Sequence, residues 1–257
     1  MPLLENNPFV HKVLDIRKCA DKKFPETFDL VLCLDEERPA CELATRVKKK
    51  ELVGTYLKDG RTLYTDSAAE WFDMSLISRF GREAADRRKW ENRKAYQEIL
   101  FNMIGKKFKG EEYVLPVQPA KEKTGVIGLE TRSGDRWVGK RWKRFDEFCR
   151  ILRAKQMPYT KFKQHPTLRG YLDSINQTDL VVTTDSLALH LALGLRKKVV
   201  CLFTITSPTE IYPYNRMIRV VNPKLEQYFY STKKTMAPSQ FILPQDVFRA
   251  VKKLATR

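Results

Sequence analysis

One stretch of the chain combines residue types that could bind a phosphorylated ligand. The run "LVVTT" at 180–184 is apolar and strand-like, and Asp185, Ser186 and a nearly all-apolar helical stretch follow it. A helix N-terminus presents unsatisfied N–H groups and about half a positive charge, which suits phosphate. His190 lies four residues after Ser186, so both side chains point along one side of the helix near that end. The same residues also permit a structural role, with Asp185 or Ser186 as an N-cap and His190 as a hydrogen-bonded core residue.

A basic segment follows another strand-like run. It reads "TRSGDRWVGKRWKRF" and covers 131–145. Lys140 offers a point charge for a phosphate, and Gly134 allows close approach of a ligand to the backbone. Two tryptophans, Trp137 and Trp142, either anchor the segment in a core or stack on a base. Spacing alone is equally compatible with a solvated basic loop.

Two further strand ends carry polar side chains. Asp35 opens an acidic cluster directly after "FDLVLCL", and a carboxylate at a strand end is a candidate general base. The structural alternative is that this cluster precedes a helix over 37–47 and favours its positive end. The segment "TSPTEIY" at 206–212 follows the next strand of the second half, and its polar residues either face the same crevice or cap the next helix.

The elements that must position these residues alternate between strand and helix. Strands are predicted at 28–35, 125–130, 179–184 and 198–203, with a hairpin around Asp59-Gly60. Helices are predicted at 37–47, 67–80, 82–105, 143–154, 167–176, 186–195 and 244–256, with a break at Gly81. Strands that alternate with helices imply parallel sheets in α/β layers.

The run 28–35 is continuously apolar, which predicts a strand covered on both faces. In open α/β sheets, ligands bind outside the carboxyl ends of the strands. This rule predicts that Lys140, Asp185 and His190 converge on one crevice. The stretch 107–125 is polar, contains two prolines and lacks periodicity, so it is interpreted as a linker. The predicted domains are 1–118 and 119–257.

The charge of the chain favours an anionic partner. Lys and Arg number 48 against 31 Asp and Glu, a net charge of +17. A nucleic-acid-binding hypothesis rests on this charge alone, because the sequence contains no recognisable nucleic-acid module. The five cysteines form no C-x-x-C pair and indicate reduced thiols in a cytosolic protein. The sequence therefore predicts no disulfide framework and no metal site, and it shows no membrane-spanning run or signal peptide.

Four stretches of the sequence resemble a known family. They read "FDLVLCLDEERPACELATRVKKKELVG", "AYQEILFNMIGKKFKGEEYVLP", "GLETRSGDRWVGKRW" and "DLVVTTDSLALHLALGLRKKVVCLFTITSPTEIY". All four are similar to segments of glycosyltransferase family 9, the ADP-heptose:lipopolysaccharide heptosyltransferases and their relatives. The likeness covers residues 24–116 and 124–250.

The resemblance implies two Rossmann-like domains with a cleft between them, the B-type glycosyltransferase fold. The C-terminal domain would hold an ADP-sugar donor, and Lys140 would pair with its phosphate. Asp185, Ser186 and His190 would bind the pyrophosphate and sugar, and Thr131 and Gly134 would line the nucleotide pocket. Such enzymes are metal-independent inverting transferases, so no cofactor is implied. The acceptor would be lipopolysaccharide core or a related glycan, and the protein would be cytoplasmic, with peripheral contact to the anionic surface of the inner membrane.

The sequence also departs from the family pattern. The block "FTITS" replaces the usual "FGPTS", Leu187 and Arg132 stand where glycines are common, and only Tyr159 through Pro166 span a gap that usually holds a strand and two glycines. The first strands of the N-terminal domain, with the family's proposed base, are expected to be missing, which makes Asp35 the substitute candidate. Two hypotheses follow: a working transferase, or a non-catalytic remnant or fragment that binds a nucleotide, a protein or an anionic surface.

Overall fold

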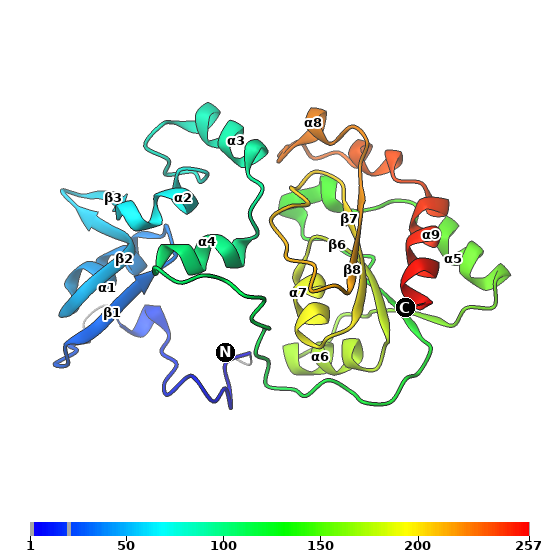
Figure 1. The fold of residues 1–257 in the computed structure, drawn as a ribbon, viewed down its shortest axis with the longest axis horizontal. Helices are drawn as coiled ribbons and strands as arrows, with labels where there is room; N and C mark the ends of the chain where they lie inside the picture. The colour runs from blue at the N-terminus through cyan, green and yellow to red at the C-terminus, as the bar shows by residue number, and fades with distance from the viewer. Residues whose placement is uncertain (1–2, 20–21, 257) are drawn as a thin grey trace. The chain divides into compact units, whose positions relative to one another are not determined.

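The computed structural model describes residues 3–19 and 22–256, which form two compact units. The first unit comprises His11–Glu111 and Thr209–Tyr212, and the second unit comprises residues 3–10, Glu112–Pro208 and the chain from Pro213 onwards. Each unit has its own sheet, with β1–β3 in the first and β4–β8 in the second (Figure 1). The predicted α/β class is therefore confirmed.

The division between the units differs from the predicted 1–118 and 119–257. The boundary in the linker falls between Glu111 and Glu112 because the start of the linker packs on the second unit. Glu112 accepts a hydrogen bond from Nη1 of Arg216 at 2.8 Å, and Leu115 packs against Gly194 so closely that a Cβ there would lie 2.6 Å from its Cδ1.

The second unit is built on a five-stranded parallel sheet in the order β5-β4-β6-β7-β8. Its strands are β4 (Ile127–Leu129), β5 (Tyr159–Lys161), β6 (Leu180–Thr184), β7 (Lys198–Phe203) and β8 (Met217–Val221). Its helices are α5 (Phe145–Ala154), α6 (Leu168–Asn176), α7 (Leu187–Gly194), α8 (Leu225–Tyr228) and α9 (Pro244–Ala255), with 3-10 helices η3 (Asp135–Lys140) and η4 (Ala237–Phe241). Strand β5 was not predicted from the sequence, where Tyr159–Pro166 was expected only to span a gap.

Helices cover both faces of this sheet. Helices α5 and α9 lie on one face and α6 and α7 on the other (Figure 1). All five residues of β6 are buried, as the apolar run predicted for a strand between two layers. Leu129, Val182, Phe148 and Leu254 belong to one core cluster between the sheet and the α5–α9 layer. This packing fixes the strand ends, where the polar residues of the sequence motifs lie.

The strand order places a reversal at the centre of the sheet. The chain leaves β4 toward the edge strand β5 and then returns to form β6 on the other side of β4. In such doubly wound sheets the loops after the two strands flanking the reversal diverge, and the crevice between them is the usual ligand site. Here those loops begin at Glu130 and Asp185.

The first unit holds a smaller sheet of three strands, β1-β2-β3, with β1 parallel to β2 and β2 antiparallel to β3. The strands are β1 (Phe28–Cys33), β2 (Lys49–Lys58) and β3 (Arg61–Tyr64). The helices are α1 (Arg38–Arg46), α2 (Ala69–Phe72), α3 (Arg82–Glu91) and α4 (Tyr96–Met103), with 3-10 helices η1 (Ile16–Lys18) and η2 (Asp66–Ala68). The predicted hairpin is confirmed, since Asp59 and Gly60 form its turn with φ of +49° and +73°.

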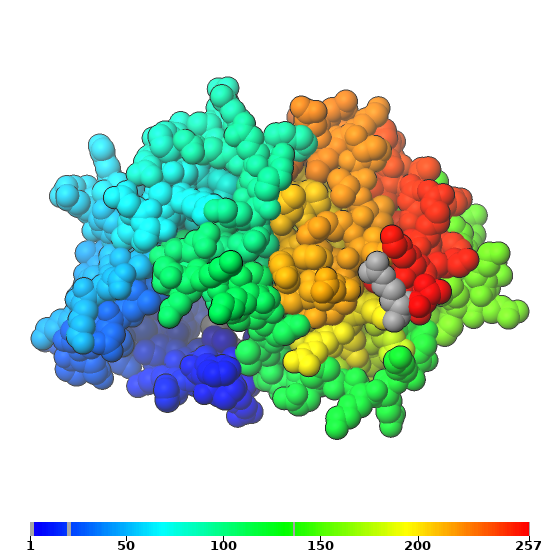
Figure 2. All heavy atoms as spheres, viewed as in Figure 1, coloured from blue at the N-terminus to red at the C-terminus, as the bar shows by residue number. Residues whose placement is uncertain are grey.

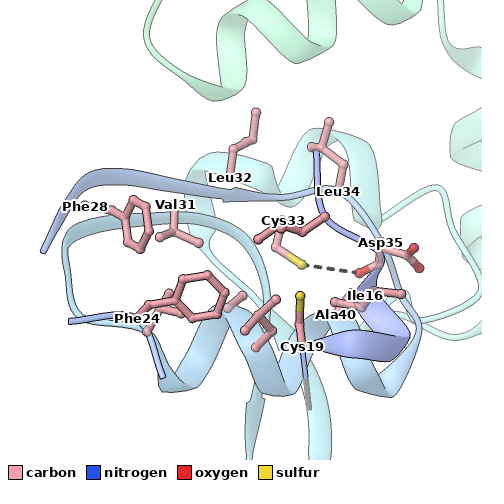
Figure 3. A pocket seen from close by; sticks show the side chains of 14 residues that line it. Ile16, Cys19, Phe24, Phe28, Val31, Leu32, Cys33, Leu34, Asp35 and Ala40 are labelled. Atoms are coloured by element: carbon pink, nitrogen blue, oxygen red, sulfur yellow. Dashed lines mark hydrogen bonds between the residues drawn. The ribbon is translucent and has the colours of Figure 1, made fainter. Parts of the chain in front are cut away.

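The prediction that β1 is covered on both faces was wrong. Leu30 is 41% exposed and Leu32 46% exposed, and as alternate residues of one strand they point to the same face, which is therefore not fully covered. Within the described residues β1 pairs with β2 alone and lies at the edge of the sheet. Between β1, α1 and the segment before Phe24 lies an apolar cavity of about 380 Å³ (Figure 3). Figure 3 shows Leu32 and Leu34 pointing away from it, while Cys33 points toward Cys19.

The predicted helices over 67–80 and 82–105 are shorter and more divided than expected. Gly81 does interrupt the helical region, with φ of +79° directly before α3. A second break separates α3 from α4, because hydrogen bonds there go to the distant segment Thr209–Tyr212. The Tyr96 amide donates to the Glu210 backbone oxygen at 2.9 Å, and the Thr209 hydroxyl donates to the Asn92 backbone oxygen at 3.0 Å.

Candidate functional site

A salt bridge joins the basic segment after β4 to the end of β6. Lys140 is the last residue of η3, and Asp185 directly follows β6. The Nζ atom of Lys140 lies 2.8 Å from Oδ2 of Asp185 and 3.1 Å from its backbone oxygen. Both side chains are mostly buried, with 17% and 18% of their surface exposed. The structure thus brings two predicted donor-site residues together across 45 positions of sequence, at the central reversal of the sheet.

Helix α7 begins beside this salt bridge. Ser186 occupies its N-cap position, yet its side chain makes no cap hydrogen bond. Its hydroxyl instead lies 3.0 Å from the hydroxyl of Thr183, inside the same strand end. The alternative role of Ser186 as a side-chain N-cap is therefore not the observed arrangement. The first turn of α7 presents N–H groups that Ser186 does not cap, beside the ammonium group of Lys140.

His190 lies one turn into α7 and is mostly buried. Its Nδ1 is 3.0 Å from the hydroxyl of Tyr113, which comes from the linker. Burial lowers the pKa of His190 below its ordinary value; Asp185 opposes this effect and Lys140 adds to it. The charges of Asp185 and Lys140 therefore both act on the pKa of the imidazole. Tyr113 was missed by sequence reasoning because its surroundings were interpreted only as a linker.

The lowered pKa of His190 predicts a pH dependence of stability. The unfolded chain binds a proton on this histidine near its ordinary pKa of about 6.5, whereas the folded chain does so only at lower pH. Between these two pKa values the unfolded state holds more protons, so stability falls as pH falls below about 6.5. We expect the free energy of unfolding in urea to drop by up to about 1.4 kcal/mol per pH unit there.

The substitution His190→Gln should flatten this slope. An equal slope in native protein and His190→Gln would contradict the assignment.

Three buried hydroxyls near the carboxyl ends of the strands lack partners. Within the described residues, the side-chain oxygens of Ser133, Thr204 and Thr206 are buried and accept or donate no hydrogen bond. Ser133 follows β4, and the two threonines follow β7. Unpaired buried hydroxyls are costly, and a phosphate or sugar would satisfy them. The sequence signal for Thr204 was the departure "FTITS", in which Thr204 and Ile205 replace the usual Gly-Pro, whereas Thr206 keeps the usual residue.

The loop after β4 also contains a polar cluster that sequence reasoning missed. The buried Glu130 carboxylate accepts two side-chain hydrogen bonds from Arg132, at 2.9 and 2.7 Å, and one from the Tyr171 hydroxyl. Burial and the contact with Glu130 raise the pKa of Tyr171. Arg132 is therefore held by Glu130.

The two residues predicted to line a nucleotide pocket lie in the same loop. Thr131 is partly exposed and Gly134 is exposed. A Cβ on Gly134 would meet nothing within 4 Å, so the protein itself leaves open space there.

The two tryptophans of the basic segment have different environments. Trp142 is 2% exposed, and its Nε1 donates to the backbone oxygen of Ile242 at 3.0 Å. Its ring contacts Phe145 and Phe148, so it anchors the segment in the core and cannot stack on a base. Trp137 is partly exposed, with its ring edge to face with Tyr230 at 6.2 Å between centroids.

The segment "TSPTEIY" does not lie as a whole at the crevice, because its residues are divided between the two units. Thr209–Tyr212 belong to the first unit, where the hydroxyl of Tyr96 donates to Oε2 of Glu210 at 2.6 Å. Glu210 is 2% exposed, so its carboxylate lies in the interior of the first unit. The Glu210 carboxylate therefore bonds to the Tyr96 hydroxyl, a contact that neither of the two alternatives drawn from the sequence included.

Asp35, the candidate base, follows β1 in the first unit. Its Oδ1 accepts a hydrogen bond from the Glu37 amide at 2.9 Å, directly before α1. Its backbone oxygen accepts one from the Thr55 hydroxyl at 2.5 Å. The residue is exposed, so an acceptor hydroxyl has access to the carboxylate. These contacts correspond to the structural alternative of a residue that organises the helix start, and a catalytic role stays a prediction.

The described residues contain no group of three or more His, Cys, Asp or Glu side chains placed to hold a metal ion. None of the helices in the described part of the chain has the length and apolar character that crossing a membrane requires.

A family model that matches part of the chain is that of the family which the sequence motifs resemble. Residues 149–238 match the model of glycosyltransferase family 9 (heptosyltransferase). This range contains Asp185, Ser186 and His190, while Lys140 lies before it. No curated protein sequence matches the chain closely enough to count as a relative.

One solved structure similar to this chain is the E. coli heptosyltransferase WaaC with ADP. It shares 13% sequence identity over 89% of this chain and 73% of that chain, with a TM-score of 0.47.

Proposed function

We propose that this chain, a member of glycosyltransferase family 9 by its residues 149–238, transfers a sugar from an ADP-sugar donor to lipopolysaccharide core or a related glycan. The observation that carries the proposal is the Lys140–Asp185 salt bridge beside the start of α7, at the central reversal of the sheet. A cation, helix N–H groups and unpaired hydroxyls there meet the needs of a diphosphate.

The donor site would work without a metal ion. Lys140 would place its ammonium group against the donor diphosphate, and the first N–H groups of α7 would face the same oxygens. As the bond to the sugar breaks, negative charge grows on the leaving diphosphate, and fixed positive groups stabilise that charge. Asp185 would keep the ammonium group in position when no donor is bound, since it contacts Nζ through two oxygens.

Inverting transfer also needs a base to take the proton of the acceptor hydroxyl. Asp35 fits this role by its place at the carboxyl end of β1 and by its exposure. Its Oδ1 already accepts a hydrogen bond from the Glu37 amide, which ties one oxygen of the carboxylate to the start of α1. Turnover is therefore expected to be slow.

The second candidate function is donor binding without transfer. The small first sheet and the structural contacts of Asp35 favour it. Such a protein would bind ADP through Lys140 and Asp185 with no use for a base. The two candidates differ only in turnover, so a turnover assay separates them.

The test is release of ADP from ADP-heptose in the presence of a deacylated lipopolysaccharide acceptor. We expect slow turnover that Asp35→Asn abolishes and Asp29→Asn leaves unchanged. Asp29 is the matched control because it is an exposed carboxylate on the same strand, paired with Lys50 at 2.6 Å. Donor binding with no turnover would favour the non-catalytic candidate, and robust turnover that survives Asp35→Asn would eliminate Asp35 as the base.

A further inference from the structure

Three of the five cysteines lie near one another in the first unit. Cys19 directly follows η1, Cys33 is the last residue of β1, and Cys41 belongs to α1. The thiols of Cys33 and Cys41 both donate to the backbone oxygen of Asp35, at 3.8 and 3.6 Å. The thiol of Cys19 donates to the backbone oxygen of Asp15 at 3.3 Å. All three are free thiols, so each is available for oxidation.

Two of these thiols face the same cavity. The apolar cavity of about 380 Å³ between β1 and α1 has both Cys19 and Cys33 in its lining. Cys41 is fully buried and does not belong to that lining. Figure 3 shows the sulfur atoms of Cys19 and Cys33 pointing toward one another. The pair that the cavity brings together is therefore Cys19 and Cys33.

The rest of the first unit holds both cysteines in place. The backbone oxygen of Cys19 accepts a hydrogen bond from Nη2 of Arg46 at 2.7 Å, which ties the segment around Cys19 to α1. Cys33 is fixed by the pairing of β1 with β2, and the Thr55 hydroxyl donates to its Sγ at 3.0 Å. The two sulfur atoms therefore meet through the fold, although the cysteines are 14 positions apart in the sequence.

The cavity gives small solutes access to the pair. Leu14, Ile16 and Phe28 line it and are 36–40% exposed, so its mouth is open to solvent. The segment that ends at Cys19, dark blue in Figure 2, lies at the molecular surface. Cys19 and Cys33 are themselves buried, which keeps bulky reagents from their sulfur atoms. The arrangement therefore selects an oxidant of the size of water, such as hydrogen peroxide, over a tripeptide disulfide.

We propose that Cys19 and Cys33 are a site of oxidative modification, at which hydrogen peroxide converts the two thiols into a disulfide. One thiolate attacks an oxygen of the peroxide, the O–O bond breaks, and the departing hydroxide takes up the thiol proton to form water. The other thiolate attacks the sulfur of the resulting sulfenic acid. An S–S bond forms, the S–O bond breaks, and a second water leaves with the second thiol proton. The two sulfur atoms lose two electrons in total, and the peroxide gains them.

The disulfide would join the segment after η1 to the end of β1. Such a cross-link closes a short loop of chain and restricts the unfolded state, so it should stabilise the first unit. It would also end the hydrogen bond from the Cys33 thiol to the backbone oxygen of Asp35. The modification involves no residue of the donor site, so it is independent of the proposed transferase activity.

The test is treatment of the full chain with millimolar hydrogen peroxide, followed by mass spectrometry under non-reducing conditions. We expect the intact mass to fall by two hydrogen atoms and dithiothreitol to reverse the change. Cleavage by trypsin and by a protease that cuts after glutamate separates Cys33 from Cys41, because Glu36 and Glu37 lie between them. The resulting peptides of Cys19 and Cys33 should be cross-linked. The melting temperature of the first unit should rise by at least about 5 °C on oxidation.

Single substitutions assign the reaction to the pair. Cys19→Ser and Cys33→Ser should each prevent the loss of two hydrogen atoms, whereas Cys41→Ser should leave the cross-link intact. Cys149→Ser is the matched control, because Cys149 is an equally buried free cysteine in the core of the second unit. It should form the cross-link as the native chain does. Circular dichroism checks that each variant folds.

The peptide map of the native chain tests the proposal even where a variant fails to fold. A cross-link between Cys33 and Cys41, or a disulfide between two chains, would overturn the assignment of the pair. An intact mass that is unchanged, or that gains oxygen without losing hydrogen, would overturn disulfide formation. None of these readouts depends on transferase activity.

Discussion

Replacing Lys140 with alanine is expected to weaken ADP binding by roughly 10- to 150-fold, the equivalent of about 1.5–3 kcal/mol for a charged hydrogen bond. The substitution removes the ammonium group that would face the diphosphate. It also leaves the Asp185 carboxylate, which is 18% exposed, without its partner beside the start of α7. That unpaired negative charge would repel the ligand and add to the loss. Isothermal titration calorimetry with ADP measures the effect.

Lys143→Ala is the matched control for this measurement. Lys143 lies three residues further along the same basic segment, is exposed, and has no ion pair within the described residues. It should bind ADP within about twofold of the native chain, since an exposed lysine away from the crevice contributes little. Equal affinities in the native chain and Lys140→Ala would remove Lys140 from the donor site. A double variant with Asp185→Asn should recover part of the affinity, because it removes the repelling carboxylate.

Trp142→Ala should destabilise the second unit by about 3–5 kcal/mol, the usual cost of removing a buried aromatic side chain. Trp142 fills the core between Phe145 and Phe148 and satisfies the Ile242 backbone oxygen, so its loss leaves a cavity and an unpaired carbonyl group. For a unit of this size the melting temperature should fall by about 6–20 °C. Differential scanning calorimetry measures the change.

Trp137→Ala serves as the comparison, because Trp137 lies in the same segment but outside the core cluster. Its loss should cost on the order of 1 kcal/mol, as most single substitutions do. A Trp142→Ala protein with native melting temperature and weakened ADP binding would contradict the packing role and restore base stacking as its function.

The sequence predicted the meeting of Lys140 and Asp185 better than it predicted the first sheet. That prediction rests on local rules: an apolar run ends, a polar residue follows, and parallel strand ends share one edge, which is why Lys140 and Asp185 meet. The exposure of β1 depends instead on whether other elements cover both faces of its sheet, and an apolar run carries no information about those elements. Strand β5 was missed because Tyr159–Lys161 is short, polar and at the sheet edge.

Long-range contacts also escaped the sequence. Glu210 looked like a polar residue at a strand end, yet it pairs with Tyr96, 114 positions earlier. His190 could be placed on its helix but its partner Tyr113 could not, because the linker shows no periodicity from which to assign a contact. The local sequence pattern predicts the face of a helix or strand on which a side chain lies. Which residue that side chain contacts depends on the whole fold.

The exchange of segments between the units bears on the order in which the chain folds during synthesis. The first unit gathers most of its residues by Glu111, but its break between α3 and α4 is held by Thr209–Tyr212. At a synthesis rate of about 5–20 residues per second, those residues emerge roughly 5–20 s after Glu111. During that interval the Tyr96 amide and hydroxyl lack their native partner. The N-terminal half therefore cannot finish folding on the ribosome until most of the second unit has been made.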